Sequence, residues 1–215
     1  MRIAAILLLL LPVGQVLGQE ALEISLVVTQ EGREIGREGF TLRPGRGRGA
    51  TGSTLVAVSR YPATNPLLKV AATLERTPEF ALAKFQLDVE GPNGTTIILA
   101  AGSGARLIVR TVAKGSEAGR ELPGGPDVVL LDESVYSLYT AVADLATPAG
   151  KSLTGVFPRS GRRASFVARR ESAGTGASRV TLTGDLIGTL VTDSKGRLQR
   201  LELPGAGILV SREQD

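Results

Sequence analysis

The chain has 215 residues with 25 basic and 21 acidic side chains, a formal net charge of +4, and neither cysteine nor histidine. The absence of these two residue types excludes Ser-His-Asp triads, Cys-His dyads, disulfides and zinc sites built from Cys and His. Cations held by carboxylates and glycosidase mechanisms based on a carboxylate pair remain open. Because the sequence shows no clustered carboxylate pattern, we expect no enzyme activity, no metal and no cofactor.

The start of the chain has the pattern of a secretory signal peptide. Arg2 precedes an apolar run, and Val16-Leu17-Gly18 supplies the small or compact residues that a signal peptidase reads. We expect cleavage after Gly18 and export to the periplasm or the outside of a bacterial cell. Gln19 stands where a lipid-anchored protein has Cys, and no later segment is apolar for long enough to be a membrane helix. The expected organisation is a signal peptide over residues 1–18 and a single β-rich domain without a transmembrane span over residues 19–215.

The exported part begins with segments in which apolar and polar residues alternate. Alternation with a period of two marks a strand with one face on a core and the other in water. Three segments show it, at residues 22–29, 68–74 and 81–90. In the third, Ala81, Ala83, Phe85, Leu87 and Val89 oppose Lys84, Gln86, Asp88 and Glu90. These segments predict amphipathic strands that share one core.

Turn residues separate the strands at short intervals. They occupy residues 31–33, 91–94, 193–196 and 204–205, and they bound further predicted strands at 95–99, 187–192, 197–203 and 208–212. Short connections favour antiparallel hairpins, because parallel neighbours need long crossovers. Segments 43–52, 114–125 and 172–177 are rich in Gly, Ser and charged residues, and they predict exposed loops.

One helical pattern interrupts the strands, between Glu133 and Ala146. Its apolar residues follow helical spacing and are Val135, Leu138, Tyr139, Val142, Leu145 and Ala146. We expect Asp132 to be the N-cap and Thr147-Pro148 to end the helix. The predicted fold class is therefore mainly β: a curved antiparallel meander, as a half-barrel or open barrel of about ten or more strands, with one amphipathic helix packed on or in its concave face.

Two concentrations of arginine are candidates for anion binding. The first is segment 43–49, and the second comprises Arg159, Arg162, Arg163, Arg169 and Arg170. No aromatic residue interleaves with the arginines of the first, and export argues against nucleic acid as its partner. We favour a solvated loop for the first and protection of a strand edge for the second, with contact to an anionic envelope surface as the alternative. Asp185, Asp193 and Glu202 are expected to serve turns rather than metal binding or acid–base chemistry.

Segments near both ends of the predicted domain carry a resemblance. They are Gly32-Arg-Glu-Ile-Gly-Arg-Glu-Gly-Phe40, Val191-Thr-Asp-Ser-Lys-Gly-Arg-Leu-Gln-Arg-Leu-Glu-Leu-Pro204 and residues 208–213. In this plan of strands the chain resembles bacterial exported proteins of unknown function, whose half-open antiparallel sheet wraps around a helix and is similar to that of periplasmic lipoprotein carriers. The resemblance implies a ligand-holding or envelope role, and it transfers no functional residue.

The expected function is that of a periplasmic binding or carrier-like module for an apolar or amphipathic, lipid-like ligand. Small core side chains on a curved sheet leave room for such a ligand between the sheet and the helix, and arginines at the rim would steer an anionic headgroup. The candidate ligand-binding residues are Val70, Ala72, Leu74, Phe85, Leu87, Leu138, Tyr139 and Val142. One alternative is a non-catalytic structural or interaction domain of the envelope in which these residues form a filled core. A second alternative is a carboxylate-based hydrolase acting on envelope polysaccharide.

Overall fold

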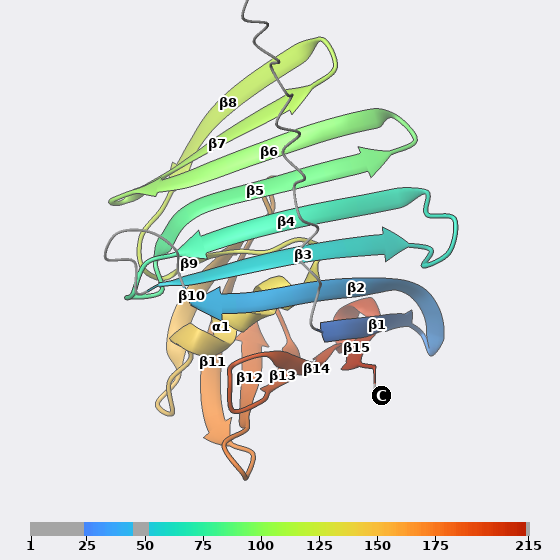
Figure 1. Cartoon of the computed structure of the whole chain (residues 1–215). Coiled ribbons are helices and arrows are strands. Elements are labelled where there is room, and N and C mark those ends of the chain that lie inside the picture. Colours follow the sequence, from blue (N-terminus) through green and yellow to red (C-terminus); the bar gives the residue numbers. More distant parts are fainter. Residues whose placement is uncertain (1–23, 45–51, 214–215) are drawn as a thin grey trace, which may run out of the picture.

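The computed structural model describes residues 24–44 and 52–213, and within them a single curved sheet of 15 strands surrounds one short helical segment (Figure 1). The first eight strands are β1 (Ile24–Gln30), β2 (Arg33–Pro44), β3 (Ser53–Tyr61), β4 (Leu68–Arg76), β5 (Leu82–Gly91), β6 (Gly94–Ser103), β7 (Arg106–Ala113) and β8 (Ser116–Pro123). The other seven are β9 (Val128–Leu130), β10 (Lys151–Val156), β11 (Arg163–Ser172), β12 (Ser178–Gly184), β13 (Gly188–Thr192), β14 (Leu198–Leu203) and β15 (Ile208–Arg212). The predicted mainly β, open-sheet fold is confirmed. The predicted signal peptide lies outside the described residues.

The first and last strands of the domain meet in the middle of the sheet. The strand order is β8-β7-β6-β5-β4-β3-β2-β1-β15-β14-β13-β12-β11-β10-β9, so two arms of hairpins extend from the β1–β15 pair. Every neighbouring pair is antiparallel except β9 and β10, which are parallel. The antiparallel meander predicted from the turns therefore needs this correction. The parallel pair arises because the chain between β9 and β10 contains the helix, and that crossover is long enough to reverse direction twice.

Alternating burial along the strands confirms the predicted amphipathic faces. In β1, Ile24, Leu26 and Val28 are buried, and β4 and β5 bury their apolar residues on the same concave side. The prediction of a loop over 114–125 is wrong, because residues 116–123 form β8. All but one of the described residues of β8 are exposed, so no hydrophobic alternation marks it in the sequence. Its pairing comes from the backbone ladder with β7.

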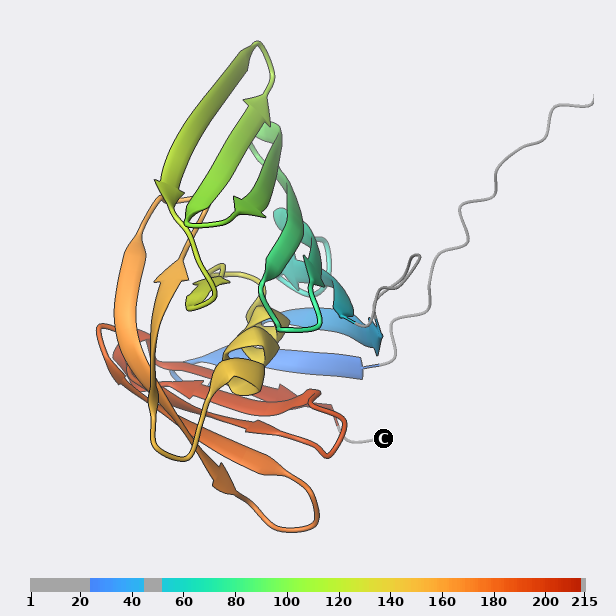
Figure 2. The ribbon, with the colours of Figure 1, turned by 90° about the vertical axis from the view of Figure 1, so that its left-hand side faces the viewer.

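The helical segment lies inside the concavity of the sheet, between the two arms (Figure 2). It consists of a 3-10 turn, η1 (Tyr136–Tyr139), followed by the α-helix α1 (Thr140–Leu145). It begins three residues later than the sequence predicts, and Asp132 is not its N-cap. Instead, the carboxylate of Glu38 on β2 accepts hydrogen bonds from the backbone N–H groups of Tyr136 at 2.7 Å and Ser137 at 2.9 Å. A distant strand therefore satisfies the free donors at the start of the helical segment.

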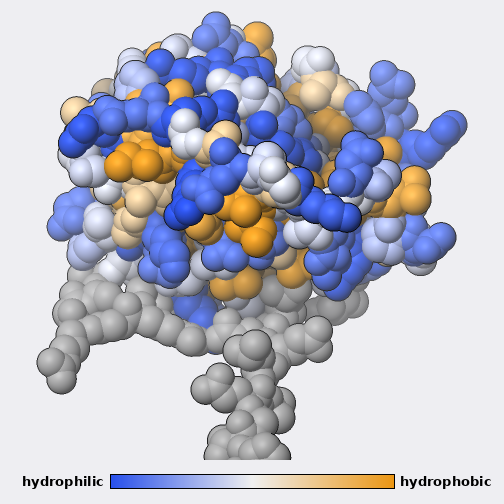
Figure 3. Space-filling model, turned by 90° about the horizontal axis from the view of Figure 1, so that it is seen from above, coloured by the Kyte–Doolittle hydropathy of each residue, from blue (hydrophilic) through white to orange (hydrophobic). Residues whose placement is uncertain are grey.

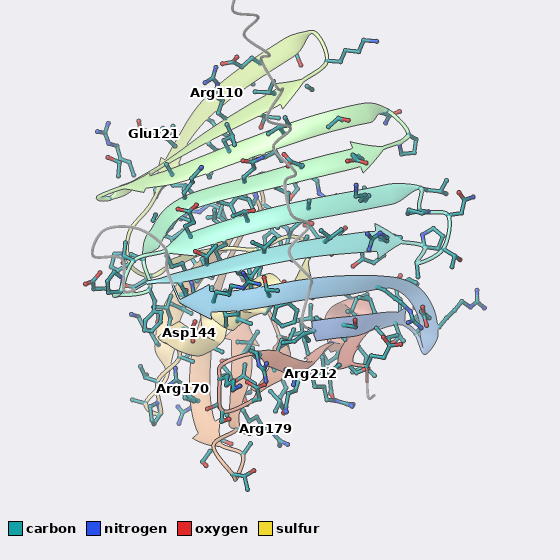
Figure 4. The ribbon with its side chains drawn as sticks, viewed as in Figure 1. Arg110, Glu121, Asp144, Arg170, Arg179 and Arg212 are labelled. Carbon is teal, nitrogen blue, oxygen red and sulfur yellow. The ribbon has the colours of Figure 1, made fainter. Side chains whose placement is uncertain are left out.

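Arginines from two strands fix the other end of the helical segment (Figure 4). Arg170 of β11 donates from Nη2 to the carbonyl oxygens of Ala143 at 2.5 Å and Asp144 at 3.0 Å. Arg76 of β4 donates to the Asp144 carboxylate at 2.5 Å. Cations at a helix C-terminus complement its partial negative charge. The helical segment is thus attached to both arms of the sheet.

The surface seen from the β8 side is mainly hydrophilic, with hydrophobic patches between the charged groups (Figure 3). Arg120 of β8 reaches the opposite arm, where it donates to the carbonyl oxygen of Pro158. None of the helices in residues 24–44 and 52–213 has the length and apolar character needed to cross a membrane.

Candidate functional site

A cavity of about 360 Å³ opens beside the start of the helical segment. It is formed where η1, the β10–β11 connection, the β12–β13 turn and the β14–β15 connection come together. Its apolar wall consists of Tyr136, Tyr139, Phe157, Leu186, Leu203 and Ile208. The first two of these residues belong to η1, and the others come from the C-terminal arm of the sheet. Three aromatic rings gathered on one wall, in a chain with few aromatic residues, distinguish this cavity from the rest of the core.

The apolar wall continues to the surface at the β12–β13 turn. Leu186 is 9% exposed, whereas its neighbour Ile187 is 62% exposed and also lines the cavity. Ala206, in the short 3-10 helix η2 (Pro204–Ala206), is exposed and also lines the cavity. An apolar molecule entering here would therefore meet apolar side chains from the mouth inward.

Four charged side chains also line the cavity. Asp132 and Glu133 lie in the segment before η1, Arg162 in the β10–β11 connection and Asp185 in the β12–β13 turn. The guanidinium of Arg162 stacks on the Phe157 ring, with its central carbon 3.5 Å from the ring centre, and its Nη2 lies 3.5 Å from Glu133 Oε1. The lining of the cavity thus contains three carboxylates and one arginine.

Asp132 is a buried member of this charged group, and its pKa departs from the ordinary value of an aspartate. Its side chain is buried, and its Oδ1 accepts hydrogen bonds from the Ser134 N–H at 2.8 Å and from Arg159 Nη2 at 3.0 Å. Its Oδ2 is also buried and has no hydrogen-bond partner in the described part of the chain. Burial raises the pKa of Asp132 to about 6, although the charge of Arg159 opposes the change. A residue that lines the cavity thus carries an acceptor atom without a donor.

A second buried carboxyl group, that of Glu38, binds the backbone of the segment that lines the cavity. Burial raises the pKa of Glu38, while its hydrogen bonds to Ser137 and Tyr136 partly counteract that increase. Tyr61 of β3 donates its hydroxyl hydrogen to the Ser134 carbonyl oxygen at 3.0 Å. Contacts from β2 and β3 therefore hold the segment that carries Asp132 and the two tyrosines of the wall in place.

The sequence-predicted ligand-binding residues lie mostly in the core behind this cavity. All eight are buried in one hydrophobic cluster, and of these only Tyr139 lines the cavity. Phe85 lies along a shallow groove over β5, β6 and β7, and the remaining six belong to the buried hydrophobic core. Their contact with a ligand stays a prediction. Those six are Val70, Ala72, Leu74, Leu87, Leu138 and Val142.

Other candidate groups from the sequence have identifiable places. Asp193 accepts hydrogen bonds from the N–H groups of Lys195 and Arg197, both at 2.9 Å, and it therefore serves a turn as predicted. Arg159 and Arg162 form ion pairs beside the cavity in addition to lying near a strand edge. Most of segment 43–49 lies outside the described residues. In the portion of the chain that the structure describes, no group of three or more acidic side chains is arranged to hold a metal ion.

Sequence reasoning missed Glu38, Phe157, Leu186 and Ile208 as parts of this region. No local pattern marks them, because they come from four separate strands or turns. The one usable signal in the sequence is Asp132, which stands directly before a helical pattern. Arg159 and Arg162, later in the chain, supply the opposite charges.

Comparison with known proteins assigns no family to the chain. No family model matches the chain, and no curated protein matches it. Among solved structures, the chain is similar to a DUF1089 family protein from Pseudomonas aeruginosa, with 13% sequence identity and a TM-score of 0.49. The alignment covers 79% of this chain and 90% of that protein. At this level of similarity the match assigns neither a family nor an activity to the chain.

Proposed function

We propose that this protein is an exported bacterial envelope protein that binds one apolar or amphipathic, lipid-like molecule in the cavity beside η1, without catalysing a reaction. The observation that supports this function is the cavity itself. Its volume of about 360 Å³ falls in the range of small-molecule sites, which are mostly apolar with a few convergent polar groups. Relative to the site expected from sequence, the proposed ligand lies at the start of the helical segment rather than between the helix and β4–β5.

The chain offers a direct binding assay because it contains no tryptophan. Ile187 lines the cavity and is 62% exposed, whereas Leu67, between β3 and β4, is 70% exposed and lines neither this cavity nor the groove over β5, β6 and β7. Ile187→Trp therefore places a single fluorophore at the mouth, and Leu67→Trp is the matched control. We expect n-decanol to shift the emission of Ile187→Trp to the blue and to saturate at one molecule per chain, and to leave Leu67→Trp unchanged.

A blocking substitution tests whether the binding site is this cavity. Ala206 is exposed on η2 and lines the cavity, so a larger side chain there narrows the entrance to the cavity without disturbing the core. Ala206→Leu in the Ile187→Trp protein should weaken decanol binding severalfold. The proposal fails if neither tryptophan protein shows saturable binding, and that result would favour a non-catalytic structural or interaction domain. Native mass spectrometry of protein purified from envelope then identifies the natural ligand.

One observation favours a second candidate function, a carboxylate-based hydrolase. Such enzymes need one carboxyl group with a raised pKa and a second carboxylate across an open site. Asp132 has a pKa raised to about 6, and Glu133 and Asp185 line the same cavity. Release of reducing sugar from envelope polysaccharide by the wild-type protein, abolished in Asp132→Asn, would establish this function. If no reducing sugar is released and decanol binds, only the binding function is supported.

A further inference from the structure

The charged groups of the cavity beside η1 constrain the polar end of a bound molecule, an inference that rests on the proposed binding function. Asp132, Glu133 and Asp185 contribute three carboxylates to the lining, against the single guanidinium of Arg162. Counting Arg159, which pairs with Asp132 from outside the lining, acidic groups still exceed basic ones by one. The charged part of the lining is thus mainly acidic, on a chain whose formal net charge is +4.

The two arginines beside these carboxylates already make contacts with protein groups. Arg159 donates to Asp132 Oδ1 and Ser134 Oγ, both at 3.0 Å. Arg162 stacks on Phe157 and lies 3.5 Å from a Glu133 oxygen. An anionic headgroup would have to compete with these carboxylates for both cations. The geometry therefore disfavours the anionic headgroup expected from the arginine content of the sequence.

By contrast, one hydrogen-bond acceptor of the site has no donor. Asp132 lines the cavity, its side chain is fully buried, and its Oδ2 has no hydrogen-bond partner within the described residues. A buried carboxylate oxygen without a donor is costly, and a ligand that supplies the donor recovers that cost on binding. Asp185 differs, because its Oδ2 accepts the Ser165 N–H at 2.9 Å.

We propose that the cavity selects amphipathic molecules whose polar end donates hydrogen bonds, a primary ammonium in preference to a hydroxyl, and that Asp132 Oδ2 receives the donor. The hydrocarbon part would lie along the aromatic wall of Tyr136, Tyr139 and Phe157 towards Ile187. An ammonium is favoured over a hydroxyl because a charge-assisted hydrogen bond is stronger than a neutral one. A carboxylate headgroup has no donor for this position.

Three probes of equal chain length test the proposal on the wild-type protein: n-decylammonium, n-decanol and n-decanoate, titrated by calorimetry below their micelle concentrations. We expect decylammonium to bind about tenfold more tightly than decanoate, with decanol between them. Asp132→Asn should reduce this preference to about twofold or less. Glu121→Gln is the matched control, because Glu121 is an exposed acid on β8 that does not line the cavity (Figure 4).

Acidification supplies a second readout. Lowering the pH from about 7.5 to about 5 protonates Asp132, whose pKa lies at about 6, while an alkylamine keeps its charge. Decylammonium should therefore bind more weakly at the lower pH in the wild type, and change little in Asp132→Asn. The charged and titratable groups that face Asp132 from the packed elements are Glu133, Arg159, Arg162, Asp185, Tyr61 and Tyr136.

The outcomes separate this inference from the function on which it rests. Saturable binding of all three probes with equal or tighter affinity for decanoate overturns the headgroup preference and leaves the binding function standing. Loss of the preference in Glu121→Gln to the same extent as in Asp132→Asn also overturns it, since the effect would then be general attraction by net charge. Saturable binding of none of the probes overturns both the inference and the proposed function.

Discussion

Asp132 should make the stability of this protein depend on pH in a direction opposite to that of most aspartates. Burial raises its pKa from 3.8 to about 6, so the folded state binds a proton more tightly than the unfolded chain does. Between these two pH values the folded protein is protonated at Asp132 and the unfolded chain is not. The free energy of unfolding therefore falls as the pH rises through this window. At 1.36 kcal/mol per pKa unit, the full contribution is about 3 kcal/mol.

The variant Asp132→Asn isolates this contribution. The amide keeps an acceptor for the Ser134 N–H but does not titrate, and all other groups cancel when the two proteins are compared. The ion pair with Arg159 adds no separate contribution, because the charge of Arg159 already lowers the Asp132 pKa and is included in its value of about 6. We expect urea unfolding to show the variant gaining about 3 kcal/mol relative to wild type as the pH rises from about 3.5 to about 7. A difference that stays constant to within about 0.5 kcal/mol over this range would refute the reasoning.

Three further substitutions test the contacts that build the site. Glu38→Ala leaves two buried N–H groups of η1 without an acceptor and should cost about 2–4 kcal/mol in urea unfolding, whereas Glu34→Ala, exposed on the same strand, should leave the urea midpoint close to that of the wild type. Arg170→Met removes the donors to the last carbonyls of α1 and should lower stability by about 1–2 kcal/mol, with a loss of helical signal in circular dichroism. Gly188→Ala places a Cβ against the backbone carbonyl oxygen of Glu202 on β14 and should lower the thermal unfolding midpoint. Gly119→Ala adds a Cβ with no atom within 4 Å and should leave that midpoint unchanged. Equal midpoints for these two proteins would contradict the close approach of β13 and β14.

The sequence by itself determined which strands have one solvent-exposed and one buried face, and it placed the helical segment along the chain. In β1, β4 and β5 the period-two pattern reports directly which side chains meet the core, because that pattern depends only on neighbours along the same strand. The stripe through Leu138 and Val142 likewise placed the helix, and Thr147-Pro148 follows its end at Leu145. The missing His and Cys bounded the available chemistry before any fold was considered.

The tertiary structure alone decided where the helical segment begins, that residues 116–123 form a strand, and where the cavity lies. The start of η1 is set by Glu38, 98 residues away from Tyr136, and β8 is a strand because β7 offers it a backbone ladder. The cavity wall comes from the helical segment and from turns and strand ends of the C-terminal arm, which are distant in sequence and meet only in the folded sheet. Local periodicity carries no information about such pairings, since the free energy that fixes them comes from contacts between segments and not from the residues within one.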